Sequence, residues 1–219
     1  MVFELNPHQI RVLGCLVEKQ LTTPDYYPLT LSALVTACNQ KSNREPVMQL
    51  DEQDVLDAIT ELQKLYLVRE KNQAGARVVK YEHKLSDTLT KQFDFSQNEL
   101  GVLAVLFLRG PQTAGEIRTR TTRMCNFDSL DAVDETLKSL AENTGQAYVQ
   151  SLARQPGRRE IRYIHLFSPV DEEALAEVAV QTNTSKASNN ELELLRNEVN
   201  ALREEMDELK SLVNELIEK

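Results

Sequence analysis

The sequence predicts a mainly α-helical protein with small β-hairpins, in which one structural unit occurs twice before a C-terminal coiled-coil helix. Three observations lead to this prediction. The seven residues 77–83 recur as residues 159–165, with Arg, Tyr and His at matching places. Helix-start signals also occur in two matching sets, and a heptad pattern of apolar residues fills residues 191–219. An internal repeat of this kind indicates that the chain uses one supersecondary unit twice.

The repeated stretch belongs to a predicted β-hairpin. Each copy follows a glycine, Gly75 or Gly157, and a short extended run that ends at residues 67–68 or 148–149. Extended runs joined by a glycine-containing loop are typical of hairpins. The second strand of each predicted hairpin is basic, since it contains two bases beside Tyr and His.

The helix-start signals lie at corresponding places in the two copies. Asn6 with Pro7 opens the first helix of copy one, and Ser96 with Glu99 opens that of copy two. Apolar residues then recur at helical spacing. The second and third helices begin after residues suited to N-capping, which are Thr30, Asp51, Thr113 and Asp128.

Each copy is therefore three helices followed by a hairpin, which is the winged-helix arrangement, a helix-turn-helix with a wing. We predict winged-helix domains over residues 1–90 and 91–168, joined near residues 86–95. A short helix and a mobile polar linker are expected over 169–190, followed by a coiled-coil helix over 191–219. One larger mixed domain is the alternative, but two complete sets of start signals argue against it.

Two stretches of the chain are distinctive at the level of residues. They are EKQLTTPDYYPLTLSAL at residues 18–34, which runs on into residues 37–44, and LRGPQTAGEIR at residues 108–118. Both resemble the bacterial YceH-like proteins, and the similarity covers about residues 3–168. The resemblance implies tandem winged-helix folding. It implies no biochemical role and no site residues.

Composition leaves the class of partner open. The 219 residues carry a net charge of −9, but residues 169–219 hold 13 acids and 5 bases, whereas residues 1–168 hold 21 acids and 20 bases. The acidity therefore belongs to the C-terminal segment. A nearly neutral body neither indicates nor excludes a nucleic-acid partner, so the distribution of charge decides.

Several classes of protein are not expected. No apolar run approaches the ~18 residues of a membrane span, and the N-terminus lacks the features of a signal peptide. Three widely spaced cysteines suggest buried free thiols in a reducing compartment, so we expect a cytoplasmic protein. Phosphate-binding glycine loops, metal-ligand motifs and nucleophile motifs are missing, and His83 and His165 are expected to be structural. We expect no enzyme, metal or cofactor.

Bases on the predicted wings and near the second helices are the candidates for nucleic-acid contacts, because Lys and Arg neutralise phosphates. The alternative is that they are ordinary solvated surface residues. The candidates are Lys41, Arg44, Lys71, Arg77, Lys80, Arg118, Arg120, Arg123, Arg154, Arg158, Arg159 and Arg162.

The predicted third helices argue against conventional readout of the DNA major groove. Residues 51–65 carry five acids and one base, and residues 128–140 carry four acids and one base. Acidic helices are repelled by phosphates, and bases such as Arg are the commoner readers of DNA. The leading hypothesis is nucleic-acid association through the wings and copy two, in a regulatory or architectural role. The alternative is a protein–protein adaptor whose acidic helices face a basic partner.

The C-terminal heptads predict a parallel, two-stranded coiled coil and hence a homodimer. Glutamates at g positions lie five residues before bases at e positions, so opposite charges meet only in the parallel pairing. A helix that folds back on the body and a solvated monomeric helix are the alternatives. The predicted dimerisation residues at a and d are Leu192, Leu195, Val199, Leu202, Met206, Leu209, Val213 and Leu216.

Overall fold

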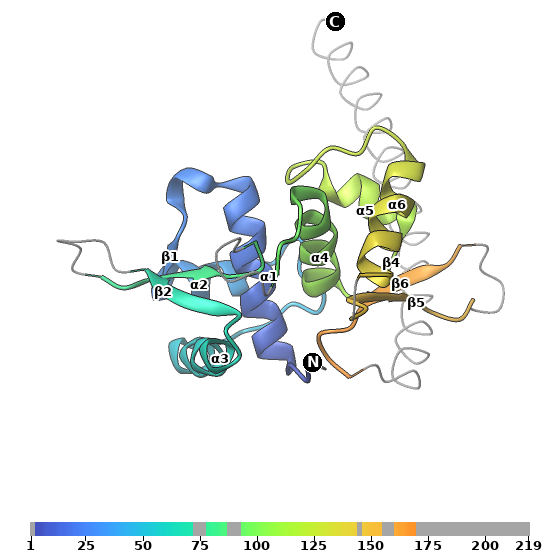
Figure 1. Ribbon diagram of the computed structural model, residues 1–219. Helices are drawn as coiled ribbons and strands as arrows, with labels where there is room; N and C mark the ends of the chain where they lie inside the picture. The colour runs from blue at the N-terminus through green and yellow to red at the C-terminus, as the bar shows by residue number, and fades with distance from the viewer. Residues whose placement is uncertain (1–2, 72–77, 87–92, 144–145, 155–159, 170–219) are drawn as a thin grey trace, which may run out of the picture. The chain divides into compact units, whose positions relative to one another are not determined.

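The computed structural model describes residues 3–71, 78–86, 93–143, 146–154 and 160–169 (Figure 1). Residues 1–169 cluster as one compact unit. The predicted coiled coil with all of its dimerisation residues lies outside the described residues, as do three of the candidate wing bases, Arg77, Arg158 and Arg159.

The first repeat contains three α-helices and a small antiparallel sheet. Its strands have the order β1-β3-β2, and Val68 on β2 lies opposite His83 on β3. The elements in chain order are α1 (Pro7–Thr22), the 3-10 helix η1 (Pro24–Tyr26), β1 (Leu29–Thr30), α2 (Leu31–Cys38), α3 (Glu52–Lys64), β2 (Val68–Lys71) and β3 (Lys80–His83).

The second repeat has the same order of helices and strands. Its sheet order is β4-β6-β5, and Val149 on β5 lies opposite His165 on β6. The elements are α4 (Gln97–Arg109), β4 (Gln112–Thr113), α5 (Ala114–Thr121), α6 (Leu130–Ala141), β5 (Val149–Ser151) and β6 (Arg162–His165). The prediction of helices with small β-hairpins is confirmed for the described residues.

The helix starts follow the local sequence signals. Asn6 accepts a hydrogen bond from the backbone N–H of Gln9 at 3.0 Å, and Ser96 forms a capping box with Glu99. The start of α6 differs from the prediction by one residue. Ser129, not Asp128, is the N-cap, and its hydroxyl accepts from the N–H of Ala132 at 3.1 Å.

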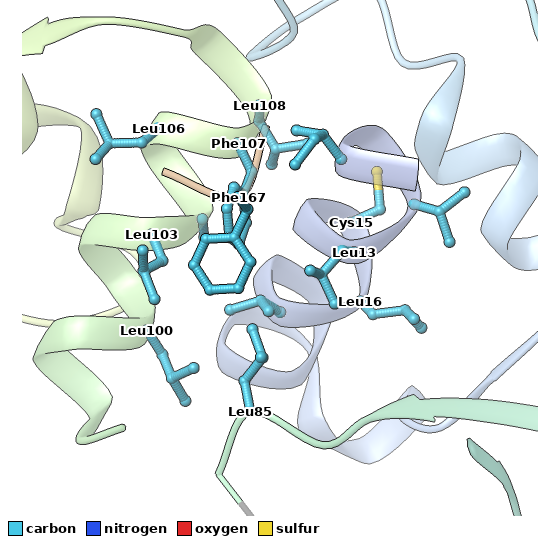
Figure 2. Packing of buried hydrophobic residues seen from close by; sticks show 14 of the residues in the cluster. Leu13, Cys15, Leu16, Leu85, Leu100, Leu103, Leu106, Phe107, Leu108 and Phe167 are labelled. Atoms are coloured by element: carbon cyan, nitrogen blue, oxygen red, sulfur yellow. The ribbon is translucent and has the colours of Figure 1, made fainter. Parts of the chain in front are cut away.

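The two repeats meet where α1 packs beside α4 (Figure 1). Gly14 permits this close approach, because a Cβ at that position would lie 2.8 Å from the Cβ of Phe107. Leucines such as Leu13 and Leu103, which occupy corresponding places in the repeats, are fully buried around the contact (Figure 2). The helix pair therefore forms one apolar core that both repeats share.

The ends of the repeats also contact each other. The N–H of Leu5 donates to the carbonyl of Phe167 at 2.9 Å, and the ring of Phe3 stacks on Phe167 with centroids 5.2 Å apart. The N–H of Glu45 donates to the carbonyl of Leu108 at 2.8 Å. Domains over 1–90 and 91–168 stay a prediction, since shared packing is compatible with two folding units.

The two repeated histidines close equivalent turns. The Nδ1 atoms of His83 and His165 accept the backbone N–H groups of Leu85 and Phe167, at 3.1 and 3.4 Å. Because Nδ1 accepts, the ring proton of His83 lies on Nε2, which faces Oε1 of Gln20. Burial lowers the pKa of each histidine to about 4, so both rings are neutral near pH 7.

Two further findings concern the state of the cysteines and the length of the apolar helices. Cys15, Cys38 and Cys125 are buried free thiols, as predicted. None of the helices in the described part of the chain is both long and apolar enough to cross a membrane.

Candidate nucleic-acid interface

A cleft with a volume of about 730 Å³ lies between the two repeats. The first repeat lines it with the end of α1 and the turn after α2, and the second repeat with α4, α5 and the residues that follow α5. We call it the basic cleft. Its lining residues are Glu18, Lys19, Thr22, Thr23, Gln40, Lys41, Ser42, Asn43, Ala104, Val105, Leu108, Arg109, Thr119, Arg120, Thr122, Arg123 and Met124.

Positive charge dominates this lining. One carboxylate, Glu18, is present, and it already pairs with Arg44 at 2.6 Å. Hydroxyl and amide groups from both repeats supply further hydrogen-bonding capacity. The cleft therefore attracts anions, because low-dielectric walls concentrate the field of the charges along them. The bases that line it are Lys19, Lys41, Arg109, Arg120 and Arg123.

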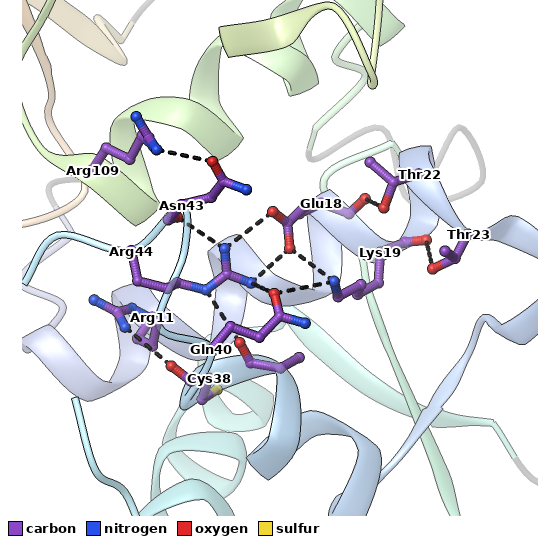
Figure 3. Close-up of polar contacts among 11 residues, drawn as sticks. Arg11, Glu18, Lys19, Thr22, Thr23, Cys38, Gln40, Asn43, Arg44 and Arg109 are labelled. Carbon is purple, nitrogen blue, oxygen red and sulfur yellow. Dashed lines mark hydrogen bonds and ion pairs between the residues drawn. The ribbon is translucent and has the colours of Figure 1, made fainter. Parts of the chain in front are cut away.

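Arg44 is a structural residue beneath the cleft, although the sequence analysis placed it among the surface bases. Its side chain is fully buried. The guanidinium uses all five of its N–H groups (Figure 3). The acceptors are both carboxylate oxygens of Glu18, Oε1 of Gln40 and the carbonyls of Ala37 and Asn43.

This arrangement fixes the turn that carries Lys41. Burial raises the pKa of Glu18, but the hydrogen bonds and charge of Arg44 outweigh burial, so that the pKa lies below its ordinary value. Asn43, in the same turn, has a φ of 59°, and its backbone carbonyl accepts a hydrogen bond from Nη1 of Arg44 at 2.9 Å. The buried ion pair thus holds the first repeat's wall of the cleft.

Arg109 connects the two walls of the cleft. Its Nη2 donates to Oδ1 of Asn43 at 2.9 Å, across the boundary between the repeats (Figure 3). Burial lowers the pKa of Arg109, and the positive charges of Arg120 and Arg44 lower it further. Positive charge is therefore crowded at this point, and an anion placed there is stabilised by several bases together.

Two of the three candidate arginines in and just after α5 line the cleft. Arg120 lies 3.6 Å from Glu116, a weak contact, and Arg123 is exposed. Arg118 instead donates to the carbonyls of residues 127 and 128 and stabilises the approach to α6. Among the described residues, Lys41 and Arg123 have no ion-pair or hydrogen-bond partner.

The remaining described candidates lie on the two hairpins, outside the cleft. Lys71 pairs with Glu82 at 3.1 Å, and Arg162 lies 3.7 Å from Glu116. Lys80 is half-buried on β3, and Arg154 is exposed after β5.

Two bases of the cleft were missed by the sequence analysis, Lys19 and Arg109. They occupy corresponding positions in the last turns of α1 and α4. The repeat alignment could have found them, because a base at the same place in both copies is a signal that does not depend on a motif.

The third helices do not contribute to the basic cleft. No residue of α3 or α6 lines it. The carboxylates of Asp57 and Glu61 on α3, and of Asp131 and Asp134 on α6, are exposed. In the described part of the chain, no group of three or more His, Cys, Asp or Glu residues could hold a metal ion.

Residues 5–158 match the family model described as "Protein of unknown function, DUF480". The chain belongs to this DUF480 family. Similar family members include UPF0502 proteins of Photobacterium profundum, 48% identical over 194 residues and 87% of each chain, and of Aeromonas hydrophila, 47% identical over 196 residues and 89% of each. Another, from Aliivibrio fischeri, is 44% identical over 96% of this chain and 97% of its own. The resemblance to YceH-like proteins is thereby confirmed.

Proposed function

We propose that this DUF480 protein is a cytoplasmic, non-catalytic protein that associates with nucleic acid in a regulatory or architectural role. One observation carries the proposal: bases from both repeats converge on one cleft, and the cleft contains a single carboxylate that is already paired. Most of the affinity of such a protein comes from neutralised phosphates. The contacts then position the protein on nucleic acid without specifying a sequence.

The proposal includes winged-helix folding of both repeats and a dimer. The order helix, strand, two helices and two strands, with sheet orders β1-β3-β2 and β4-β6-β5, supports the winged-helix assignment. The heptads of residues 191–219 support a parallel coiled-coil homodimer. A dimer carries two basic clefts. A nucleic acid that is bound at one cleft is therefore held near the other, which raises its effective concentration there.

The test compares two pairs of charge reversals in the full-length protein. Lys41→Glu/Arg123→Glu changes one base on each wall of the cleft. Lys64→Glu/Lys138→Glu makes the same change of charge on the exposed faces of α3 and α6. Fluorescence anisotropy at low salt measures the affinity for labelled single-stranded and duplex DNA of mixed sequence, and circular dichroism checks folding.

We expect the cleft variant to lose about 100-fold in affinity, since two charge-assisted contacts contribute about 3 kcal/mol together. The control variant should bind like the wild type. Equal losses in both variants, or no binding by the wild type, would contradict the proposal. A loss confined to the control would instead indicate readout by the third helices.

The second candidate function is a protein–protein adaptor, favoured by the exposed carboxylates of α3 and α6. Such surfaces attract a basic protein through charge complementarity. The discriminating variant is Asp57→Lys/Glu61→Lys. It should abolish capture of a basic partner if the adaptor function is correct, and leave DNA binding intact if the nucleic-acid function is correct.

A further inference from the structure

The shape of the basic cleft bears on which form of nucleic acid it accepts. Duplex-reading proteins insert a protruding helix or β-ribbon into the major groove, which is about 12 Å wide. Here the bases line a concave surface between the repeats. The third helices, which would have to enter the groove, expose carboxylates such as Asp57 and Asp131. The third helices thus have the wrong charge for the major groove of a duplex, and the basic cleft has the wrong curvature.

The apolar part of the lining, here called the floor, consists of Ala104, Val105 and Leu108 from α4 and Met124 after α5. These residues are 0–8% exposed, so the apolar surface that they offer is small and comes mainly from Met124. A duplex keeps its bases stacked inside and presents only sugar and phosphate to a concave surface, so it would leave this floor without a matching group. An unpaired base has an apolar face, and the polarisable sulfur of a methionine packs well against an aromatic ring.

The size of the cleft agrees with a thin ligand. A volume of about 730 Å³ lies within the ~300–1,000 Å³ typical of sites that enclose small molecules. Grooves that bind single strands combine basic side chains that follow the phosphate backbone with surfaces on which nucleobases pack. Both parts are present here. The packing surface is aliphatic, however, so a nucleobase packed on it contributes less to the binding free energy than the ~1–3 kcal/mol of an aromatic stack.

We propose that the basic cleft binds an unpaired nucleic-acid strand that crosses from one repeat to the other. Its phosphates lie at the walls and one of its nucleobases packs on the floor. This inference rests on the proposed function and names its substrate class. Lys41 contacts the strand from the first repeat, and Arg120 and Arg123 contact it from the second. Arg109 lies at the boundary, where it donates a hydrogen bond to Asn43 across the two walls.

The experiment uses the full-length protein and a labelled 12-nucleotide strand, as DNA and as RNA, alongside the duplex of the same sequence. An abasic 12-mer has the same phosphates without bases. Anisotropy at low salt should show the single strand binding at least about tenfold more tightly than its duplex, and the abasic strand binding more weakly than the natural one. The tighter of DNA and RNA identifies the source of the strand.

Two single variants test whether the strand bridges the repeats. Lys41→Glu and Arg123→Glu should each weaken single-strand binding about tenfold, because each removes a contact from a different repeat. An effect of only one variant would overturn the bridging geometry. Equal or tighter binding of duplex, still lost in Lys41→Glu/Arg123→Glu, would overturn this inference and leave the proposed function standing. Absence of binding to every oligonucleotide would overturn both.

Discussion

Removal of one partner from the buried pair of Glu18 and Arg44 should strongly destabilise the protein. In Glu18→Gln, the guanidinium of Arg44 keeps its charge but loses two carboxylate contacts, at 2.6 and 3.0 Å, inside the fold. Breaking a buried pair in this way costs about 3–5 kcal/mol, because the remaining charge has no counter-charge. Arg44→Met leaves the Glu18 carboxylate with Lys19, at 3.3 Å, in place of its buried partner, and also frees the carbonyls of Ala37 and Asn43.

The assay is urea and thermal unfolding followed by circular dichroism. A loss of this size lowers the Tm of a unit of this length by on the order of 10 °C. The double variant Glu18→Gln/Arg44→Met should lose less than the sum of the single variants, since it removes both charges of the buried pair together. Tm values within 2–3 °C (about 1 kcal/mol) of wild type for both single variants would refute the reasoning.

The chain contains a matched control for this pair. Lys64 and Glu61 form an ion pair at the same distance, 2.6 Å, but their side chains are 65% and 51% exposed. Surface pairs contribute about 0–1 kcal/mol, so Glu61→Gln should have little effect on unfolding. A comparable loss in Glu61→Gln would show that contact distance, not burial, determines the effect.

Three further predictions concern pH, packing and assembly. His83 and His165 have pKa values of about 4 in the folded state and about 6.5 when unfolded, so stability is lost as pH falls from 6.5 towards 4. At pH 5 each histidine should lower the free energy of unfolding, measured in urea, by about 2 kcal/mol. The variant His83→Asn/His165→Asn should show a weaker dependence of this free energy on pH. Gly14→Ala should lower the free energy of unfolding by about 1 kcal/mol, because overpacking against Phe107 costs about 2 kcal/mol and exceeds the gain in helix propensity. Gly115→Ala in α5, where a Cβ has room, should raise the free energy of unfolding. Truncation after residue 182 should convert the proposed homodimer to a monomer in sedimentation, and an unchanged mass would exclude the coiled coil as the dimer contact.

Local features of the fold were predictable from the sequence. The caps at Asn6 and Ser96 depend on residues three positions apart, so short-range patterns found them. The cap of α6 was misplaced by one residue because Asp128 and Ser129 are both good caps. The strands β1 and β4 were not predicted, since two residues are too few to show a period.

The candidate site was only partly predictable, because it depends on contacts between distant residues. Lys41, Arg120 and Arg123 were named as candidates from their charge and their places in or near the predicted second helices. The burial of Arg44 results from its pairing with Glu18, 26 residues earlier, which no local pattern signals. The cleft itself exists because α1 packs on α4. That contact also determines which of the bases scattered along the sequence share one surface.

The most direct test of the central claim, that bases of the cleft neutralise phosphates, is the salt dependence of binding. The three contacts of Lys41, Arg120 and Arg123 to a single strand predict a slope of about −2 for log K against log salt concentration, at about −0.7 per phosphate. Lys41→Glu/Arg123→Glu should reduce this slope by about two thirds, and Lys64→Glu/Lys138→Glu should leave it unchanged. A slope near zero in the wild type, or one that the cleft variant does not alter, would contradict the claim.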